Sequence, residues 1–246
     1  MYKSIYFLLI IILLNACGSH DDSNSSTLST LIKPNFTYKQ DFFNCNLNNN
    51  NSLINLESFF SKVVEEYKIN KSQKFNLSIL FPNASEEVSS FIISISSNSN
   101  HLEVLKFIEK LEEYKFDDIA SCTFSIYQRN ALDLINISDN VDNDYTFIEI
   151  LRCEYNSDSN YGTFKIAIDR FVNKIGTLNI PYSLSYVEDK TTSKGFIWIN
   201  YFYSEDYKDF LSTNWINEID SSEIKEEFVT NAVCSDSRGY RAFKLL

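Results

Sequence analysis

Histidine, the side chain that most often moves protons in catalysis, is almost missing from this sequence. His101 is the one histidine beyond residue 38, so a Ser-His-Asp triad or a site with several histidine ligands has too little material. The sequence contains no short motif of zinc proteases, serine hydrolases or dinucleotide-binding loops, and its five glycines leave little for cradling phosphate. It therefore predicts no catalytic residue, no metal site and no cofactor.

The strongest signal for ligand binding is an aromatic stretch at residues 196–203. Side chains alternate across a strand, so Trp198 is expected on one face and Tyr201 and Tyr203 on the other. Core packing explains most of these rings. Where the sheets do not close completely, we predict a candidate ligand pocket lined by Trp198, Tyr201, Tyr203 and His101.

The alternate spacing of Asn156, Asp158 and Asn160 is that of the start of a calcium loop. The pattern fails because Tyr161 stands where such a loop needs glycine, and Ala167 stands where it needs a bidentate glutamate. An ordinary polar loop is the prediction here.

The N-terminus is typical of a secreted protein. Lys3 precedes an apolar run of ten residues at 5–14, and a helix of that length rises only about 15 Å, half of what a bilayer needs. Residues 14–17 resemble the bacterial lipobox, in which the cysteine becomes the acylated first residue. We therefore predict a lipoprotein signal peptide at 1–16, lipidation at Cys17 and a flexible polar tether at 17–38. An ordinary cleaved signal with a chance cysteine is the alternative.

Composition narrows the setting further. The chain of 246 residues is 44% hydrophobic and 15% aromatic, which is enough to bury a core. Its formal net charge of −11 repels phosphate backbones, so no nucleic-acid partner is expected. Because Gly18 follows the cysteine directly, the sequence resembles lipoproteins that are sent to the outer membrane. We expect a bacterial outer-membrane lipoprotein that faces the periplasm.

One pattern occurs twice along the chain. Ungapped alignment of Cys45 with Cys153 matches apolar positions at helical spacing in both copies. In each copy two strands, a second helix and a final strand near Cys122 or Cys234 follow. This predicts an α+β protein made of two tandem ferredoxin-like βαββαβ repeats, at 39–130 and 145–246, with a linker at 131–144.

The four cysteines of the two repeats allow three pairings. In the ferredoxin-like unit the last strand lies antiparallel beside the first, which favours disulfides Cys45–Cys122 and Cys153–Cys234. Pairing Cys45 with Cys153 and Cys122 with Cys234 keeps the symmetry in another way and stays open. An oxidising periplasm favours disulfides over free thiols.

Two such units in tandem resemble the dimeric α/β-barrel superfamily, with antiparallel sheets packed as a pseudo-dimeric barrel within one chain. The residues that carry the likeness to tandem-domain proteins of marine bacteria are Cys45-Asn46, the stretch 196–200 and Cys234-Ser235. The resemblance implies that His101 is a candidate haem ligand or proton carrier, since some barrels of the superfamily use a histidine.

For function, the leading hypothesis is a non-enzymatic envelope lipoprotein that binds a small apolar ligand or an envelope protein. Its basis is the anchor, the tether and the shortage of catalytic residues. The alternative is an oxygenase-like or haem-binding α/β-barrel enzyme. A purely structural envelope component is the third hypothesis.

Overall fold

A computed structural model gives the fold of the chain. The residues that it describes are 33–70, 75–83, 89–98, 101–136, 146–178, 180–192, 194–217 and 221–246. The predicted signal peptide at 1–16, Cys17 and most of the predicted tether lie outside the described residues. Within the described part of the chain, no helix has the length and hydropathy needed to cross a membrane.

The described part of the first half contains two helices and five strands, with one short 3-10 helix. In order they are β1 (Tyr38–Leu47), α3 (Leu53–Asn70), β2 (Phe75–Pro82), β3 (Ser90–Ser97), α4 (His101–Glu113), η2 (Phe116–Asp118), β4 (Ala120–Thr123) and β5 (Arg129–Ile135).

In the second half, the described residues form three helices and four strands. In order they are β6 (Thr146–Tyr155), α5 (Tyr161–Gly176), β7 (Tyr182–Glu188), β8 (Gly195–Phe202), α6 (Glu205–Asn217), α7 (Ser221–Asn231) and β9 (Ala232–Lys244).

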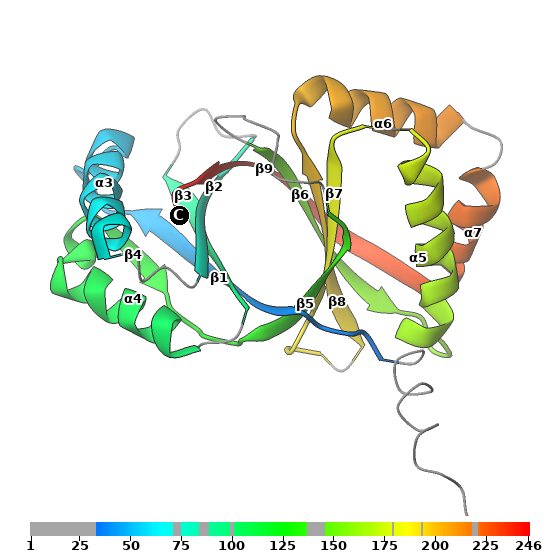
Figure 1. Cartoon of the computed structure of the whole chain (residues 1–246), viewed down its shortest axis with the longest axis horizontal. Helices are drawn as coiled ribbons and strands as arrows, with labels where there is room; N and C mark the ends of the chain where they lie inside the picture. Colours follow the sequence, from blue (N-terminus) through cyan, green and yellow to red (C-terminus); the bar gives the residue numbers. More distant parts are fainter. Residues whose placement is uncertain are drawn as a thin grey trace, which may run out of the picture.

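The strands form one antiparallel sheet that closes on itself. Its order is β3-β2-β9-β6-β8-β7-β5-β1-β4, and an additional pairing of β1 with β3 completes a ring from which only β4 is left out. Figure 1 looks down this ring, which eight strands form. A barrel of about eight strands has an interior just wide enough for packed side chains or one small ligand.

Two strands join the halves of the chain edge to edge. β9 pairs with β6 over most of its length, and its end pairs with β2 of the first half. β5 pairs with β1 and then with β7 of the second half. Of the stretch 131–144 that was expected to be a linker, residues 131–135 belong to β5 and thus to a barrel strand. The strand that the sequence analysis expected near Cys122 is β4, which begins at Ala120 and contains this cysteine.

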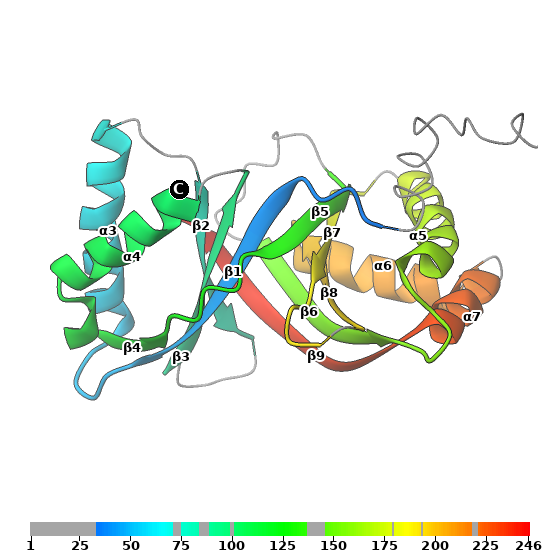
Figure 2. The same ribbon diagram turned by 90° about the horizontal axis from the view of Figure 1, so that it is seen from below.

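The helices cover the outside of the barrel, with α3 and α4 on one side and α5, α6 and α7 on the other (Figures 1 and 2). Each helix buries one apolar stripe at helical spacing. On α3 the stripe is Leu56, Phe59, Phe60 and Val63, and on α5 it is Phe164, Ala167, Ile168, Phe171 and Ile175. Two apolar cores thus lie between helices and barrel, and a third fills the middle of the barrel.

Two disulfides are present, Cys45–Cys122 and Cys153–Cys234. They are the pairs within each half that the sequence analysis favoured. In each, the two cysteines stand directly opposite each other on antiparallel strands, β1 with β4 and β6 with β9. Each disulfide fastens the last strand region of a half to its first strand.

Candidate functional site

The four residues of the predicted ligand pocket do not lie together. Trp198 faces the helices of the second half, whereas Tyr201 and Tyr203 face the barrel interior, as the two-residue period of a strand requires. The backbone of His101 begins α4 on the outer side of the barrel, and its side chain lies outside what the structure describes. The prediction of one pocket is therefore wrong, and its members belong to separate places.

Trp198 takes part in a polar network at the edge of an apolar cavity of about 340 Å³ beneath α5, α6 and α7. The Asn200 side-chain oxygen accepts hydrogen bonds from the Trp198 indole N–H at 2.9 Å and from the Tyr182 hydroxyl at 2.7 Å. The Asn200 amide donates to Glu149 at 2.8 Å, and Glu149 accepts a further bond from Ser237. Burial raises the pKa of Tyr182 well above its ordinary value, so its hydroxyl stays a donor. The side chains of this network satisfy one another's hydrogen-bonding groups, so its role is structural.

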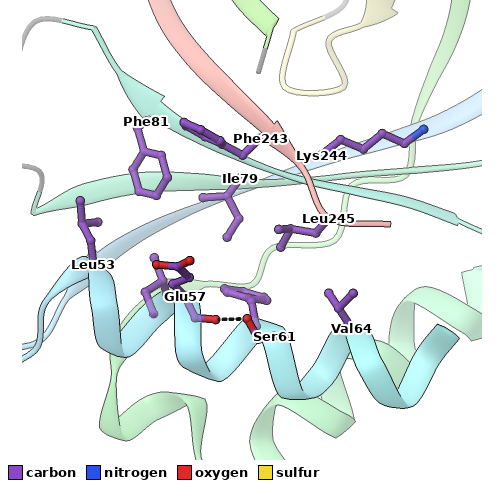
Figure 3. A pocket seen from close by; sticks show the side chains of 11 residues that line it. Leu53, Glu57, Ser61, Val64, Ile79, Phe81, Phe243, Lys244 and Leu245 are labelled. Atoms are coloured by element: carbon purple, nitrogen blue, oxygen red, sulfur yellow. Dashed lines mark hydrogen bonds between the residues drawn. The ribbon is translucent and has the colours of Figure 1, made fainter. Parts of the chain in front are cut away.

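A cavity of about 520 Å³ lies between α3 and the strands β2 and β9. Figure 3 shows apolar side chains of α3 and of the sheet facing each other across it, while the Lys244 side chain extends away from the helix. The hydroxyl of Ser61 donates to the backbone oxygen of Glu57 at 2.8 Å, so it is already used by its own helix. This cavity offers apolar surface but few groups that could orient a reacting molecule.

The barrel interior contains a cavity at each end, separated by the apolar core of Leu80, Ala131, Ile148, Val187, Ile197 and Ile199 among others. The inward side chains of β1 show the division, since Tyr38 and Gln40 line one cavity and Phe42 and Asn44 line the other. We call the first the tyrosine cavity and the second the arginine cavity.

The tyrosine cavity, about 240 Å³, includes Tyr201 and Tyr203. Its central acceptor is Asp133, which takes hydrogen bonds from the Tyr38 hydroxyl at 2.9 Å and the Ser185 hydroxyl at 2.6 Å. Burial is the main cause that raises the pKa of both Tyr38 and Tyr201. The donors and acceptors of this cavity thus bind one another.

The arginine cavity is about 230 Å³, below the roughly 300 Å³ at which sites for drug-sized ligands begin. Polar and apolar side chains from most strands of the barrel line it. They are Phe42, Asn44, Ile92, Thr123, Ser125, Tyr127, Arg129, Ile150, Arg152, Thr191, Ile197, Asp236, Arg238 and Tyr240. Three of the chain's five arginines therefore meet in one small space of a strongly acidic protein.

A turn held by Asp41 positions the deepest of these arginines. The Asp41 carboxylate accepts hydrogen bonds from the backbone N–H groups of Tyr127 at 2.9 Å and Gln128 at 2.8 Å. Gln128 has φ of 47°, a left-handed conformation that costs a non-glycine residue about 1–2 kcal/mol. The two hydrogen bonds offset this cost and start β5 with Arg129 facing inward.

Arg129 is only 8% exposed, and its Nε and Nη1 atoms are buried with no hydrogen-bond partner among the described residues. Its guanidinium carbon lies 4.4 Å from the centre of the Tyr127 ring. Burial is the main cause that lowers the pKa of Arg129, while the negative charges of Asp189 and Asp41 act in the opposite direction. Leaving such donors unpaired costs about 1–3 kcal/mol for each group. The fold thus holds two buried guanidinium donors that the described residues do not satisfy.

The other charged groups of the arginine cavity lie nearer its mouth. Arg152 and Arg238 are exposed, and the Arg238 Nε donates to Asp236 at 3.1 Å. Asp236 is the one carboxylate in the lining, so it is the natural proton acceptor there. Every second residue of β6 and β9 faces the barrel interior, and this alternation could have identified Arg152 and Arg238 as lining residues. The sequence analysis did not trace it that far.

Haem and metal ions do not fit the arginine cavity. Its lining has no histidine, cysteine or methionine, and burial raises the pKa of Tyr240, which opposes the phenolate that would bind iron. Three guanidinium groups also repel a metal cation. Among the described residues, no group of three or more histidine, cysteine, aspartate or glutamate side chains gathers that could hold a metal.

Solved structures share this arrangement of strands and helices. A structure from Lactobacillus acidophilus that bears the provisional name of a monooxygenase matches with a TM-score of 0.51 and 8% identity, over 85% of this chain and 95% of the other. A second, provisionally named a chlorite dismutase, matches with a TM-score of 0.52 and 12% identity, over 85% and 95%. This chain has a dimeric α/β-barrel fold.

The dimeric α/β barrel agrees with the superfamily that the sequence resembles. At identities this low the likeness concerns the fold. No protein-family model matches the sequence, and comparison with curated proteins finds no match either.

The neighbours correct one prediction. A non-enzymatic binding module was the leading hypothesis, but the proteins with which this dimeric α/β barrel shares its fold bear the names of enzymes. That hypothesis inferred an absence of catalytic groups from the shortage of histidines, whereas arginine and aspartate side chains meet inside the barrel. The alternative hypothesis, an α/β-barrel enzyme, agrees better with these neighbours.

Proposed function

We propose that this chain is an oxygenase-like α/β-barrel enzyme that converts a small organic substrate in the arginine cavity. The observation that carries the proposal is a cavity inside a closed barrel whose buried Arg129 donors the fold leaves unsatisfied. Interior polar groups without partners are costly, so those that persist point to a catalytic role or to a bound ligand, ion or water. The provisional names of the two structural neighbours, a monooxygenase and a chlorite dismutase, favour oxygen chemistry.

The proposed reaction relies on the chain's own side chains. Asp236 accepts a proton from an acidic C–H group of the substrate, and the arginines stabilise the negative charge that develops. In the balanced reaction a CH₂ group and O₂ become a C=O group and water. The carbon supplies the electrons, one oxygen atom enters the product, and the other leaves in water with both hydrogens.

The test is oxygen uptake by the purified chain with a panel of small organic compounds that have acidified C–H groups, followed by mass spectrometry with isotopically labelled O₂. We expect one labelled atom in the product and a rate that falls about 10²–10⁴-fold in Asp236→Asn. Asp169→Asn, on the exposed face of α5, is the matched control and keeps the rate. Oxygen uptake that is absent across the panel, or equal in Asp236→Asn, contradicts the proposal.

Two further parts of the biology are proposals as well. We propose that Cys17 is lipidated and anchors the chain to the bacterial outer membrane on its periplasmic side, as the lipobox-like stretch at 14–17 favours. Replacing Cys17 with serine should move the protein from the membrane fraction to the soluble fraction.

We also propose that the halves at 39–130 and 145–246 arose by duplication, which their similar element order supports.

A further inference from the structure

We infer that the arginine cavity binds the carboxylate of a small organic acid, with the buried guanidinium of Arg129 as the group that recognises it. The inference rests on the proposed function and deepens it, because it names the class of substrate that the same cavity takes.

The first support is the state of Arg129 itself. Its side chain is more than nine-tenths buried and lines the cavity, yet its Nε and Nη1 atoms find no partner in the described part of the chain. A guanidinium group only donates hydrogen bonds, and an ionised carboxylate only accepts them, through two oxygens. Both atoms are covered by their surroundings, so a carboxylate in the cavity reaches them when the Arg129 side chain turns toward it, and it then supplies what they lack in the form that gives the strongest hydrogen bonds.

The second support is the distribution of charge. Arg152 and Arg238 join Arg129 in the lining, whereas the single carboxylate of the lining, Asp236, is already hydrogen-bonded to Arg238. Arg170, outside the cavity, is instead paired with Glu223 and Glu227 on the surface. The lining thus carries more positive than negative side chains, although the carboxylates of Asp189 and Asp41 also act on Arg129, and a lining of this charge attracts anions into the barrel.

The third support is the shape of the remaining lining, which separates an organic acid from a bare inorganic anion. Phe42, Ile92, Ile150 and Ile197 form the apolar part of the wall. The volume of about 230 Å³ leaves room for a small apolar or aromatic body beside the carboxylate. Phosphate would satisfy the arginines but would leave this apolar wall uncovered.

The experiment is isothermal titration of the full chain with sodium benzoate, with neutral benzamide and with inorganic phosphate. We expect benzoate to bind at least ten-fold more tightly than either of the other two probes, and to weaken as salt rises. Arg129→Met should lower the affinity for benzoate at least ten-fold. Arg170→Met, at an arginine outside the cavity, is the matched control and should bind as the wild type does.

Several results would overturn the inference. These are equal affinity for benzoate and benzamide, tighter binding of phosphate than of benzoate, or an Arg129→Met variant that binds benzoate as tightly as the wild type. Thermal unfolding shows whether Arg129→Met is folded, and if it is not, Arg152→Met gives the same comparison at an exposed position.

The outcome is separable from that of the proposed function. Benzoate binding that depends on Arg129, together with no oxygen uptake, would keep the carboxylate site and remove the oxygenase. Oxygen uptake that Arg129→Met leaves unchanged would keep the enzyme and remove the carboxylate site.

Discussion

Arg152 of β6 stands opposite Asp236 of β9, although the next residue, Cys153, pairs with Cys234. Ser235 is therefore an extra residue in β9, which is a β-bulge. Because side chains alternate along a regular strand, Cys234 and Asp236 would face the same side if Ser235 occupied an ordinary paired position between them. The bulge allows one strand to supply a cysteine to the disulfide and, two residues later, a carboxylate to the interior.

Deleting Ser235 should therefore give a regular β6–β9 ladder that still pairs Cys153 with Cys234 and Arg152 with Asp236. We expect the disulfide to form, and Asp236 and Arg238 to keep facing inward. Benzoate affinity should change by less than about three-fold, and the free energy of unfolding should change by less than about 1 kcal/mol, because no pairing in the ladder is lost. Titration calorimetry and urea unfolding measure the two effects. Ser235→Ala is the control that keeps the bulge, whereas a ten-fold loss of affinity in the deletion variant would contradict the assignment of Ser235 as the extra residue.

The two disulfides should contribute similar stability, since they close loops with sequence separations of 77 and 81. Chain entropy predicts up to about 4.5 kcal/mol for each. Replacing both cysteines of one pair by serine should therefore lower the free energy of unfolding by roughly 3–4.5 kcal/mol, as urea titration measures. A reductant should lower the wild type by as much as both double substitutions together, and should leave the variant with all four serines unchanged. A loss below about 1 kcal/mol for either pair would show that the folded state gains little from it.

The parts of the fold that follow from local spacing were predictable. The apolar positions of α3 and α5 repeat at helical spacing, and Cys45 and Cys153 hold the same place in their strands. The closed ring was less accessible, because β5 is short and its Asp133 lies at the start of the acidic stretch that suggested a linker. Pairing of β5 with β7 decides its structure, and this is a contact between distant segments.

The arginine cavity was missed for a related reason. An ungapped alignment of the two halves follows side-chain direction only until the Ser235 bulge, after which inward and outward positions exchange. Arg129 begins its strand after the turn at Gln128, so its inward direction also depends on an irregular backbone. The composition carried one usable signal, since arginine is rare in this sequence and its positions could have been followed.

Asn200 should be the most sensitive residue of the polar network beneath the second helical layer. Replacing Asn200 by leucine leaves the Trp198 indole and the Tyr182 hydroxyl without their acceptor, at about 1–3 kcal/mol for each buried donor. We expect a total loss of roughly 2–5 kcal/mol in the free energy of unfolding, together with a change in Trp198 fluorescence. Asn76→Leu, whose amide makes one exposed bond of 3.3 Å to Ser96, is the control and should lose less than about 1 kcal/mol. Equal losses at both positions would contradict a structural role for the network.

Alkaline pH should unfold the protein through its buried tyrosines. The Tyr155 and Tyr186 hydroxyls lie 2.8 Å apart, and burial is the main cause that raises both pKa values above the ordinary value of about 10. Below pH ~10 these phenols are protonated in both the folded and the unfolded chain, so the full stability is present. Above it the unfolded chain releases the protons and the folded chain retains them.

Stability should therefore fall as pH rises beyond about 10, by up to roughly 1.4 kcal/mol per pH unit for each such tyrosine. Urea unfolding at a series of pH values measures the slope, and ultraviolet absorbance of tyrosinate follows ionisation as the chain unfolds. Tyr155→Phe removes one titrating group, so its slope should be shallower by about one proton. Its stability at pH 7 reports separately on the lost hydrogen bond to Tyr186. A variant with the wild-type slope would mean that Tyr155 ionises in the folded chain, against the burial seen at this position.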